Sequence, residues 1–401
     1  MEVFPLLKED NFLVNPERLA NTIDEINNSL QRVYNRRHGY VPRVVAFLNA
    51  NPNNPTGKVM GEKDVELLTQ ISQVCLERGV FVIDDMVYMS YYANTKEPSE
   101  DPKNQTARFV YAPIDDIDNK TFLDLQTTGD VVDGKVIDMV YDTILMKKDD
   151  NTIYIMWTAR TEENYYRFYC PFDTKSKKLG KIGVNRFKVG DTVNDFSVSG
   201  IKSALAENEI PCKKMYSDIG IMQKLSSREE NGEIYYYSGT YSGDFTCIIK
   251  SKDLITWEYV SQPDFINDSK WENATYVLGD KIYYFVRQQD TNKCGFLTAY
   301  ALLTSTWDRP VEIEDCQSRG DFILYDNKLY LFGAPIDRQH IGIVQVDTDD
   351  ISNSRILLQA KMHTSCFYPF IQFMEDGGTA MSYTVARKHI RMARFAMEKY
   401  I

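Results

Sequence analysis

The chain has 401 residues, carries a formal net charge of −11, and is 12% aromatic. This length exceeds what a single hydrophobic core usually holds, so two domains are expected. The negative charge argues against nucleic acid or an anionic membrane as a partner.

The sequence lacks the usual signals for membrane insertion, secretion and metal binding. No apolar run approaches membrane length, and the first eight residues lack the basic and apolar regions of a signal peptide, which favours a cytoplasmic protein. Seven cysteines are scattered without C-x-x-C spacing, so reduced thiols are expected. The four histidines show no ligand spacing, so no metal site is expected. The oligomeric state stays open.

The first hundred residues predict a small α/β segment. Asn15-Pro16 is an N-cap and first-turn pair, and it precedes apolar residues at helical spacing. An apolar strand at 43–48, a helix at 61–78 and a second apolar strand at 80–83 follow. Strand, helix and strand within about forty residues make a βαβ unit with parallel strands.

Two motifs lie at the carboxyl ends of these strands, where open α/β sheets bind ligands. They are N-P-N-N-P-T-G at 51–57 and D-D-M-V-Y at 84–88. Together they resemble the large domain of fold-type I, class I/II aminotransferases over about residues 1–95. The resemblance implies that Asn54 and Tyr88 bind the ring oxygen of pyridoxal phosphate and that Asp85 pairs with its pyridinium nitrogen.

The segment departs from that family in its covalent anchor. The expected Schiff-base lysine is missing, because Lys96 and Lys103 lie in a polar run without the serine-rich context. The preceding glycine-rich phosphate-binding part is missing as well. We therefore interpret the segment as a vestigial, non-catalytic fragment and expect no cofactor. A pyridoxal-phosphate-dependent aminotransferase is the alternative function from another enzyme class.

A turn followed by an aromatic strand recurs through the rest of the chain. The unit is clearest at 231–262, where Asn231-Gly232 precedes an aromatic strand, a glycine-rich turn, a second strand and a corner that ends on Trp257. From Tyr235 onward the copies lie roughly 50 residues apart, which is the spacing of propeller blades. The first interval is longer and carries an insertion around 175–213.

Five copies of this unit predict a mainly β fold. The expected architecture is a five-bladed β-propeller at 121–401, preceded by the α/β segment at 1–96 and a polar linker at 97–120. A strand from 109–112 or 121–125 is a candidate to close the ring of blades.

The chemistry of a propeller lies near its axis, where the innermost strand of each blade begins. The ionisable and phenolic residues expected there are Asp142, Asp218, Glu272, Arg319, Asp321 and Tyr368. Carboxylates that converge on one pocket raise each other's pKa, which separates a general acid from a general base. Two carboxyl groups that flank a sugar linkage are what glycoside hydrolysis requires.

Three motifs carry a second resemblance, over about residues 120–396. V-Y-D-T-I-L at 140–145, S-K-D-L-I-T-W at 251–257 and W-E-N-A at 271–274 resemble the five-bladed propeller glycosidases of families 43 and 32. The resemblance implies that Asp142 is the base, or the nucleophile in the retaining family. It also implies that Asp218 tunes the pKa and that Glu272 is the general acid.

The expected function is hydrolysis of a glycosidic bond in a small oligosaccharide, without a cofactor. Arg319, Asp321, Tyr368 and Arg287 are expected to bind the substrate. An inverting mechanism is expected, with roughly 6.5–9.5 Å between the carboxyl groups of Asp142 and Glu272. The family usually has proline after the first aspartate, whereas this chain has threonine.

Two alternatives remain for the propeller. In a sialidase-like enzyme, Arg287, Arg338 and Arg387 form an arginine cluster and Tyr368 is the nucleophile, although no arginine begins the first blade. In a non-catalytic carbohydrate-binding propeller, the carboxylates only hydrogen-bond sugar hydroxyls.

Overall fold

The structure is a computed structural model of the 401-residue chain. It describes residues 15–34, 46–48, 81–83, 86–97, 102–113, 117–162, 164–212, 215, 219–221, 224–243, 245–263, 269–288, 294–314, 316, 318–334, 338–362, 365–373, 378–386 and 388–400.

The chain divides into two compact units. One comprises Met1–Met89 and Phe109–Leu123, and the other comprises Ser90–Arg108 and Asp124–Ile401. Among the described residues, no helix is both long enough and apolar enough to cross a membrane.

The first unit contains part of the expected βαβ segment. Helix α1 (Pro16–Tyr34) starts after Asn15, whose side chain accepts a hydrogen bond of 3.0 Å from the amide of Arg18. Strands β1 (Ala46–Leu48) and β2 (Phe81–Ile83) pair in parallel, as the sequence predicts. The predicted helix at 61–78 lies outside the described residues.

A three-stranded sheet in the order β3-β4-β5 occupies part of the stretch expected to be a linker. Its strands are β3 (Met86–Asn94), β4 (Gln105–Pro113) and β5 (Thr121–Thr127), and the short helix η3 (Pro102–Asn104) precedes β4. The linker at 97–120 is therefore not wholly irregular. Burial explains the difference, because Ala107 and Phe109 of β4 are fully buried although polar residues precede them.

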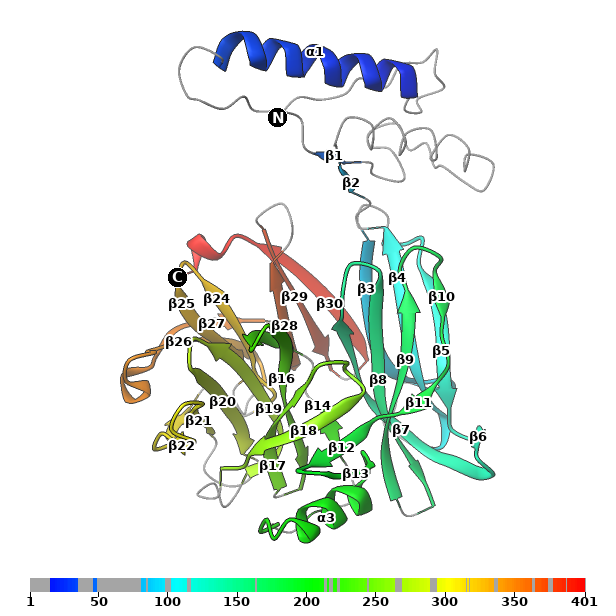
Figure 1. Cartoon of the computed structure of the whole chain (residues 1–401), viewed down its shortest axis with the longest axis vertical. Helices are drawn as coiled ribbons and strands as arrows, with labels where there is room; N and C mark the ends of the chain where they lie inside the picture. Colours follow the sequence, from blue (N-terminus) through cyan, green and yellow to red (C-terminus); the bar gives the residue numbers. More distant parts are fainter. Residues whose placement is uncertain are drawn as a thin grey trace. The chain divides into compact units, whose positions relative to one another are not determined.

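Five antiparallel blades follow along the chain, which confirms the predicted five-bladed β-propeller (Figure 1). Their principal strands, in blade order, are β7 (Lys135–Lys147), β8 (Thr152–Thr161) and β9 (Asn164–Asp173); β16 (Glu233–Ser242), β17 (Phe245–Ser251) and β18 (Thr256–Ser261); β19 (Ser269–Leu278), β20 (Lys281–Gln288) and β21 (Gly295–Ala301); β24 (Asp321–Tyr325), β25 (Lys328–Gly333), β26 (His340–Val346) and β27 (Arg355–Lys361); and β28 (Cys366–Phe373), β29 (Thr379–Val385) and β30 (His389–Phe395).

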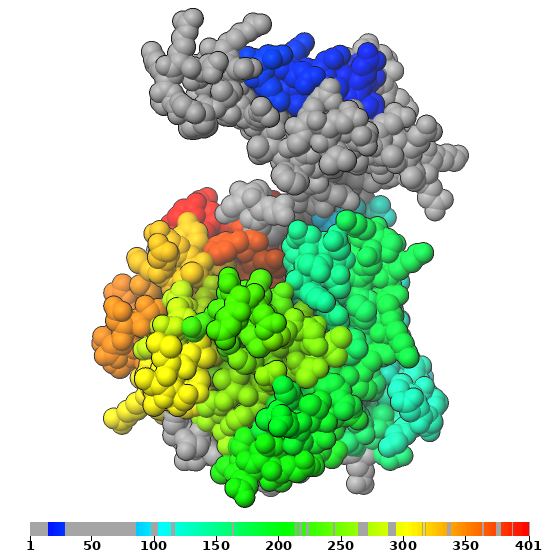
Figure 2. All heavy atoms as spheres, viewed as in Figure 1, coloured from blue at the N-terminus to red at the C-terminus, as the bar shows by residue number. Residues whose placement is uncertain are grey.

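Short elements extend these blades. The first carries β6 (Val131–Val132), β10 (Lys178–Leu179) and β11 (Gly183–Val184); the second carries β12 (Arg186–Val189), β13 (Thr192–Asp195), β14 (Gly220–Ile221) and β15 (Ser226–Glu230); and the third carries β22 (Thr306–Trp307) and β23 (Val311–Ile313). The helices of this region are α3 (Val198–Glu207), η4 (Ile351–Asn353) and η5 (Met397–Lys399). The predicted insertion around 175–213 forms β10 to β13 and α3, and α3 is drawn in green in Figure 2.

The hydrophobic cores lie between neighbouring blades. Trp257 and Met156 belong to the core that the first two blades share, while Phe285 and Phe322 belong to the core between the third and fourth blades. The S-K-D-L-I-T-W corner has a structural role. The Asp253 side chain accepts hydrogen bonds of 2.8 and 2.7 Å from the backbone amides of Ile255 and Thr256, which stabilises the turn. Inter-blade packing of this kind fixes the inner strands, on which the candidate site depends.

Candidate active site

Two site residues lie where the inner strand of a blade is irregular. The pairing register of β7 shifts between Tyr141 and Ile144, and that of β28 shifts between Phe367 and Phe370. Asp142 and Tyr368 lie within these shifts with φ of 55° and 54°, a left-handed conformation that non-glycine residues rarely adopt. Such bulges re-aim a side chain out of the regular pleat and often occur next to active sites.

Asp142 is held by residues from three other strands or loops. Arg319 Nη2 donates a 2.5 Å hydrogen bond to Asp142 Oδ1, and the hydroxyl of Tyr241 donates a 3.0 Å bond to Oδ2. Arg167 Nη1 lies 3.7 Å from Oδ2 and donates to the Asp142 carbonyl at 2.9 Å. Both carboxylate oxygens are therefore engaged by protein donors.

Close backbone packing fixes this side chain further. Gly220 in β14 leaves no space for a side chain, because a Cβ there would overlap Asp142 Oδ2 and the ring of Tyr241. A glycine at this position lets the inner strand of the second blade approach the carboxylate of the first.

Glu272 lies in the register shift of β19, between Ser269 and Asn273. Arg287 from the neighbouring strand β20 donates a short hydrogen bond to Glu272 Oε2, and both residues are buried. Burial lowers the pKa of Arg287, but the charges of Glu272 and Tyr368 outweigh burial and raise it overall. Arg287 is therefore a permanent cation beside Glu272.

Tyr368 lies among charged groups. The guanidinium carbon of Arg319 is 5.2 Å from its ring centroid, and Arg338 stacks at 4.5 Å on the adjacent Phe367. The negative charge of Glu272 is the largest cause that raises the pKa of Tyr368 to about 12, while Arg287, Arg319 and Arg338 oppose it. The phenol is thus protonated at neutral pH and lies in the electrostatic field of the Glu272 carboxylate.

Arg319 joins these groups into one site. Burial lowers its pKa, but the charges of Asp142 and then Glu272 raise it overall, together with Tyr241 and Tyr368. We call the whole set the arginine–carboxylate cluster, which consists of Asp142, Arg167, Tyr241, Glu272, Arg287, Arg319, Arg338 and Tyr368.

The structure separates Asp321 from this cluster. Its side chain is 3% exposed, pairs with Lys224 at 2.9 Å and accepts a 2.8 Å hydrogen bond from the amide of Ile371. Asp321 therefore links the fourth blade to the fifth through a buried ion pair and a backbone hydrogen bond, and its expected role in substrate binding stays a prediction. The predicted site residues Asp218 and Arg387 lie outside the described residues.

Sequence reasoning missed Arg167, Tyr241 and Lys224. Arg167 was detectable in principle, since it is a charged residue within the aromatic strand β9 and is fully buried. Burial lowers its pKa, and the charge of Asp142 opposes that effect. The local sequence around Tyr241 and Lys224 does not indicate that they belong to a buried polar network. Their partners, Asp142 and Asp321, are about 100 residues away in the chain.

Of the three residues predicted to bind pyridoxal phosphate, the structure describes only Tyr88. Tyr88 lies in β3, and its ring stacks on Phe109 with a centroid distance of 6.1 Å and an interplanar angle of 3°. It also contacts the ring of Tyr111. Its phenyl face is therefore occupied by an aromatic cluster, while Asn54 and Asp85 lie outside the described residues. No group of three or more metal-ligating side chains occurs within the described ranges either.

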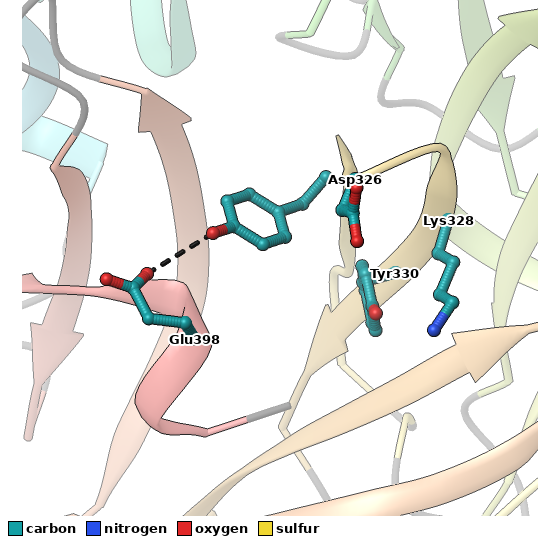
Figure 3. A pocket seen from close by; sticks show the side chains of 5 residues that line it. Asp326, Lys328, Tyr330 and Glu398 are labelled. Atoms are coloured by element: carbon teal, nitrogen blue, oxygen red, sulfur yellow. Dashed lines mark hydrogen bonds between the residues drawn. The ribbon is translucent and has the colours of Figure 1, made fainter.

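A surface hollow of about 460 Å³ lies apart from the arginine–carboxylate cluster (Figure 3). It is lined by Tyr325, Asp326, Lys328, Tyr330 and Glu398, and Tyr325 donates a 3.2 Å hydrogen bond to Glu398. We place the candidate site at the cluster instead, because several buried ionisable groups converge there and perturb one another's pKa values.

Comparison with known proteins supports the N-terminal resemblance. The family model of aminotransferase class I and II matches residues 1–120, which is less than a third of the chain. No curated protein matches the chain.

Solved structures similar to this chain include sialidases and a polysaccharide lyase. The intramolecular trans-sialidase from Ruminococcus gnavus is 10% identical over 79% of this chain and 92% of its own, with a TM-score of 0.48. A mutant NanB sialidase from Streptococcus pneumoniae is 9% identical over 79% and 67%, with a TM-score of 0.47. The polysaccharide lyase Uly1 is 11% identical over 78% and 75%, with a TM-score of 0.42. In a further NanB structure, with Optactamide, this chain covers 66% of the other chain, just under two thirds.

Proposed function

We propose that the propeller hydrolyses the glycosidic bond of a sugar that carries a carboxylate group. Tyr368 is the nucleophile, Glu272 is its base, and the arginines bind the sugar's carboxylate. This corresponds to the sialidase-like alternative rather than to the pair of Asp142 and Glu272 that the sequence favours.

The observation that carries the proposal is the electrostatic coupling of Tyr368 to Glu272. A phenol is a weak nucleophile while it is protonated, and it needs a base that accepts its proton as it attacks. Glu272 is the largest cause of the raised pKa of Tyr368, which supports a role for its carboxylate as that base. Arg287 is hydrogen-bonded to Glu272 and keeps the carboxylate oriented.

The guanidinium groups favour an acidic substrate. Arg287, Arg319 and Arg338 all lower the pKa of Tyr368, which supports a set of cations close to its phenol. Arginine binds carboxylates through paired N–H donors in a fixed plane, which gives orientation as well as affinity. A neutral sugar would leave these cations without a counter-charge from the ligand.

The reaction then proceeds in two displacements. Tyr368 Oη attacks the anomeric carbon as its proton passes to Glu272, the bond to the leaving oxygen breaks, and a glycosyl–tyrosine bond forms. In the second displacement water attacks the same carbon while protonated Glu272 returns its proton to the departing oxygen of Tyr368. The Glu272 carboxylate that results accepts the proton of the water and later releases it to solvent. Two displacements at one carbon predict retention of configuration.

Asp142 has an orienting role in this scheme. Its oxygens accept hydrogen bonds from Arg319 and Tyr241, so they hold the arginine in place. The alternative, in which Asp142 and Glu272 act as an inverting acid–base pair, remains a prediction.

A substrate panel with a matched pair of variants tests the proposal. The panel contains aryl glycosides of acidic and neutral sugars, whose phenolate leaving groups depart without an acid. Wild type should release the phenol from an acidic sugar only, and Tyr368→Phe should lose at least about a hundredfold in kcat. Tyr400→Phe, at an exposed position, is the control and should retain full activity. Binding of acidic sugars without turnover in wild type would show a binding protein instead.

A further inference from the structure

The surface hollow shown in Figure 3 has the size of a small-molecule binding site and is separate from the arginine–carboxylate cluster. Its volume of about 460 Å³ falls in the range of ligand pockets, roughly 300–1,000 Å³. Tyr325, which lines the hollow, is the last residue of β24, whereas Asp321 is the first and follows Arg319 closely. At about 3.3 Å per residue, the strand places Tyr325 roughly 13 Å from Asp321. The hollow therefore lies at the other end of this strand from the cluster.

Three of the lining side chains stand on one face of the fourth blade. Tyr325 lies opposite Lys328 in the pairing of β24 with β25, so both side chains point to the same face. Tyr330 is two residues further along β25 and therefore shares that face with Lys328. Ile323 and Tyr330 belong to the core that the fourth blade shares with the fifth. The three side chains thus stand on the face that packs on the fifth blade.

Both sides of the hollow are fixed by the fold. On one side, Asp326 and Asn327 form the two-residue turn between β24 and β25, with φ of 47° and 58°, as in a type I′ turn. On the other side, η5 is anchored by Met397, which is 1% exposed. Glu398 of η5 accepts the 3.2 Å hydrogen bond from the hydroxyl of Tyr325 that Figure 3 shows. The hollow is therefore preformed, which lowers the cost of ordering it around a ligand.

The polar side chains of the hollow have capacity for further hydrogen bonds. Asp326, Lys328 and Glu398 are all exposed. Within the part of the chain that the structure describes, the side chains of Asp326 and Lys328 form no hydrogen bond or ion pair, and Glu398 uses one oxygen for Tyr325. The ammonium group of a lysine only donates, and ionised carboxylates only accept. The hollow therefore offers both donors and acceptors to a ligand.

This combination favours a neutral ligand that carries several hydroxyl groups. An anion would be repelled by Asp326 and Glu398, and an organic cation would be repelled by the ammonium group of Lys328. A hydroxyl group both donates and accepts, so one sugar ring can bond to the carboxylates and to the lysine together.

The aromatic rings suit the apolar face of a sugar. Tyr325 and Tyr330 both line the hollow, and rings of this kind supply a large contact area with few rotatable bonds. The Tyr325 ring is supported by Phe373, with a centroid distance of 5.7 Å and an interplanar angle of 37°. The C–H groups of a pyranose can pack on such a ring while its hydroxyl groups reach the polar side chains.

We propose that this hollow is a second carbohydrate site, which binds a neutral sugar unit without acting on it. Its ligand differs in charge from the acidic sugar proposed for the arginine–carboxylate cluster. Binding in the hollow needs no turnover at the cluster, so this proposal does not rest on the proposed function.

Ligand-observed NMR titrations of the full chain test the site. The probes are the methyl glycosides of glucose, galactose, mannose, xylose and N-acetylglucosamine, and at least one should bind wild type saturably. Glu398→Ala and Lys328→Met each remove one charged hydrogen-bonding group at an exposed position and should weaken binding about tenfold. Tyr325→Ala removes the ring and should weaken binding at least as much. Glu229→Ala, at an exposed position in β15, is the matched control and should bind like wild type.

The same titrations define the contradicting results. The proposal is overturned if no probe binds wild type, or if Glu398→Ala and Lys328→Met bind as tightly as wild type. Tighter binding of tetramethylammonium than of any sugar would show a cation site instead. Tyr368→Phe should leave binding of the neutral probe unchanged, and a loss there would place the probe in the cluster. Failure to hydrolyse acidic aryl glycosides would contradict the proposed function alone.

Discussion

Asp142 and Tyr368 occupy matching positions in the inner strands of the first and last blades. Each lies where the antiparallel register shifts, with φ of 55° and 54°. Both reach Arg319: the Asp142 carboxylate accepts a 2.5 Å hydrogen bond, and the Tyr368 ring lies 5.2 Å from the guanidinium carbon. A repeated backbone irregularity therefore brings an acid and a phenol from opposite ends of the propeller sequence to one arginine.

Substitution of the two carboxylates distinguishes their roles. Glu272→Gln removes the base for Tyr368 and should lower kcat by about 10²–10⁴-fold. Asp142→Asn keeps the shape and one acceptor for Arg319, so a loss of only about tenfold is expected from the weaker hydrogen bond. The measurement is steady-state kinetics on an acidic aryl glycoside. Equal, large losses in the two variants would instead support an acid–base pair.

The ionisation of Tyr368 should depend on Glu272. The folded-state pKa is raised to about 12 from an ordinary 10, so the phenol stays protonated through the neutral range and loses its proton only in strong alkali. Glu272→Gln removes the largest cause of that shift, while the arginines continue to favour the phenolate, so the pKa should fall. NMR of ¹³Cζ-labelled tyrosine, assigned with Tyr368→Phe, measures this pKa.

A control for that titration is Glu233→Gln, an exposed carboxylate that pairs with Lys252 on the surface. It should leave the Tyr368 resonance unchanged. A Tyr368 pKa that does not move in Glu272→Gln would mean that the two side chains are not coupled.

Much of the fold was predictable because each blade repeats the same local chemistry. Turn residues, aromatic strands and the S-K-D-L-I-T-W corner are encoded within about 30 residues, and the corner hydrogen bonds of Asp253 are local. Strand β4 was expected only over 109–112, because the polar run before it dominated the pattern, while its buried residues depend on packing from elsewhere.

The site was predictable only in part. The starts of the inner strands located Asp142, Glu272, Arg319 and Tyr368 in one site, because propeller topology brings those positions together. Their pairing was not predictable, since Arg319 and Asp142 are 177 residues apart. The ion pair of Asp321 was not predictable for the same reason, because its partner Lys224 is 97 residues away in the chain.

Gly220→Ala tests the close packing around Asp142. The added methyl group would overlap the Asp142 carboxylate and the Tyr241 ring, both of which are buried. Overpacking should lower the free energy of unfolding by about 1–3 kcal/mol and reduce turnover as Asp142 shifts. Urea denaturation and kinetics measure both effects.

The matched control is Gly232→Ala, at a turn where no heavy atom lies within 4 Å of the added Cβ. Its φ of 80° makes some loss of stability expected, of about 1–2 kcal/mol. Its turnover should remain normal. Full activity in Gly220→Ala would contradict the account of how Asp142 is held.

The ion pair of Lys224 and Asp321 should contribute to stability rather than to catalysis. Lys224 donates to Asp321 and to the carbonyls of Phe322 and Ile371, at 2.9, 2.5 and 2.6 Å. Lys224→Met leaves a buried carboxylate without its cation and should lower the free energy of unfolding by about 3–5 kcal/mol.

Lys252→Met, which breaks an exposed pair, is the control and should change the free energy of unfolding by no more than about 1 kcal/mol. Adding Asp321→Asn to Lys224→Met should restore part of the loss, because the buried charge is removed. An additive loss in the double variant would show that the two residues do not form a functional pair in the folded state.

Trapping the glycosyl–enzyme intermediate tests the assignment of Tyr368 as nucleophile most directly. A fluorinated acidic sugar with a good leaving group should react once and then hydrolyse slowly, because fluorine destabilises the positively charged transition state of the second step. Peptide mass spectrometry of the inactivated wild-type protein should place one sugar on Tyr368, and Tyr368→Phe should remain unlabelled. A sugar attached to Asp142 or Glu272 would contradict the assignment.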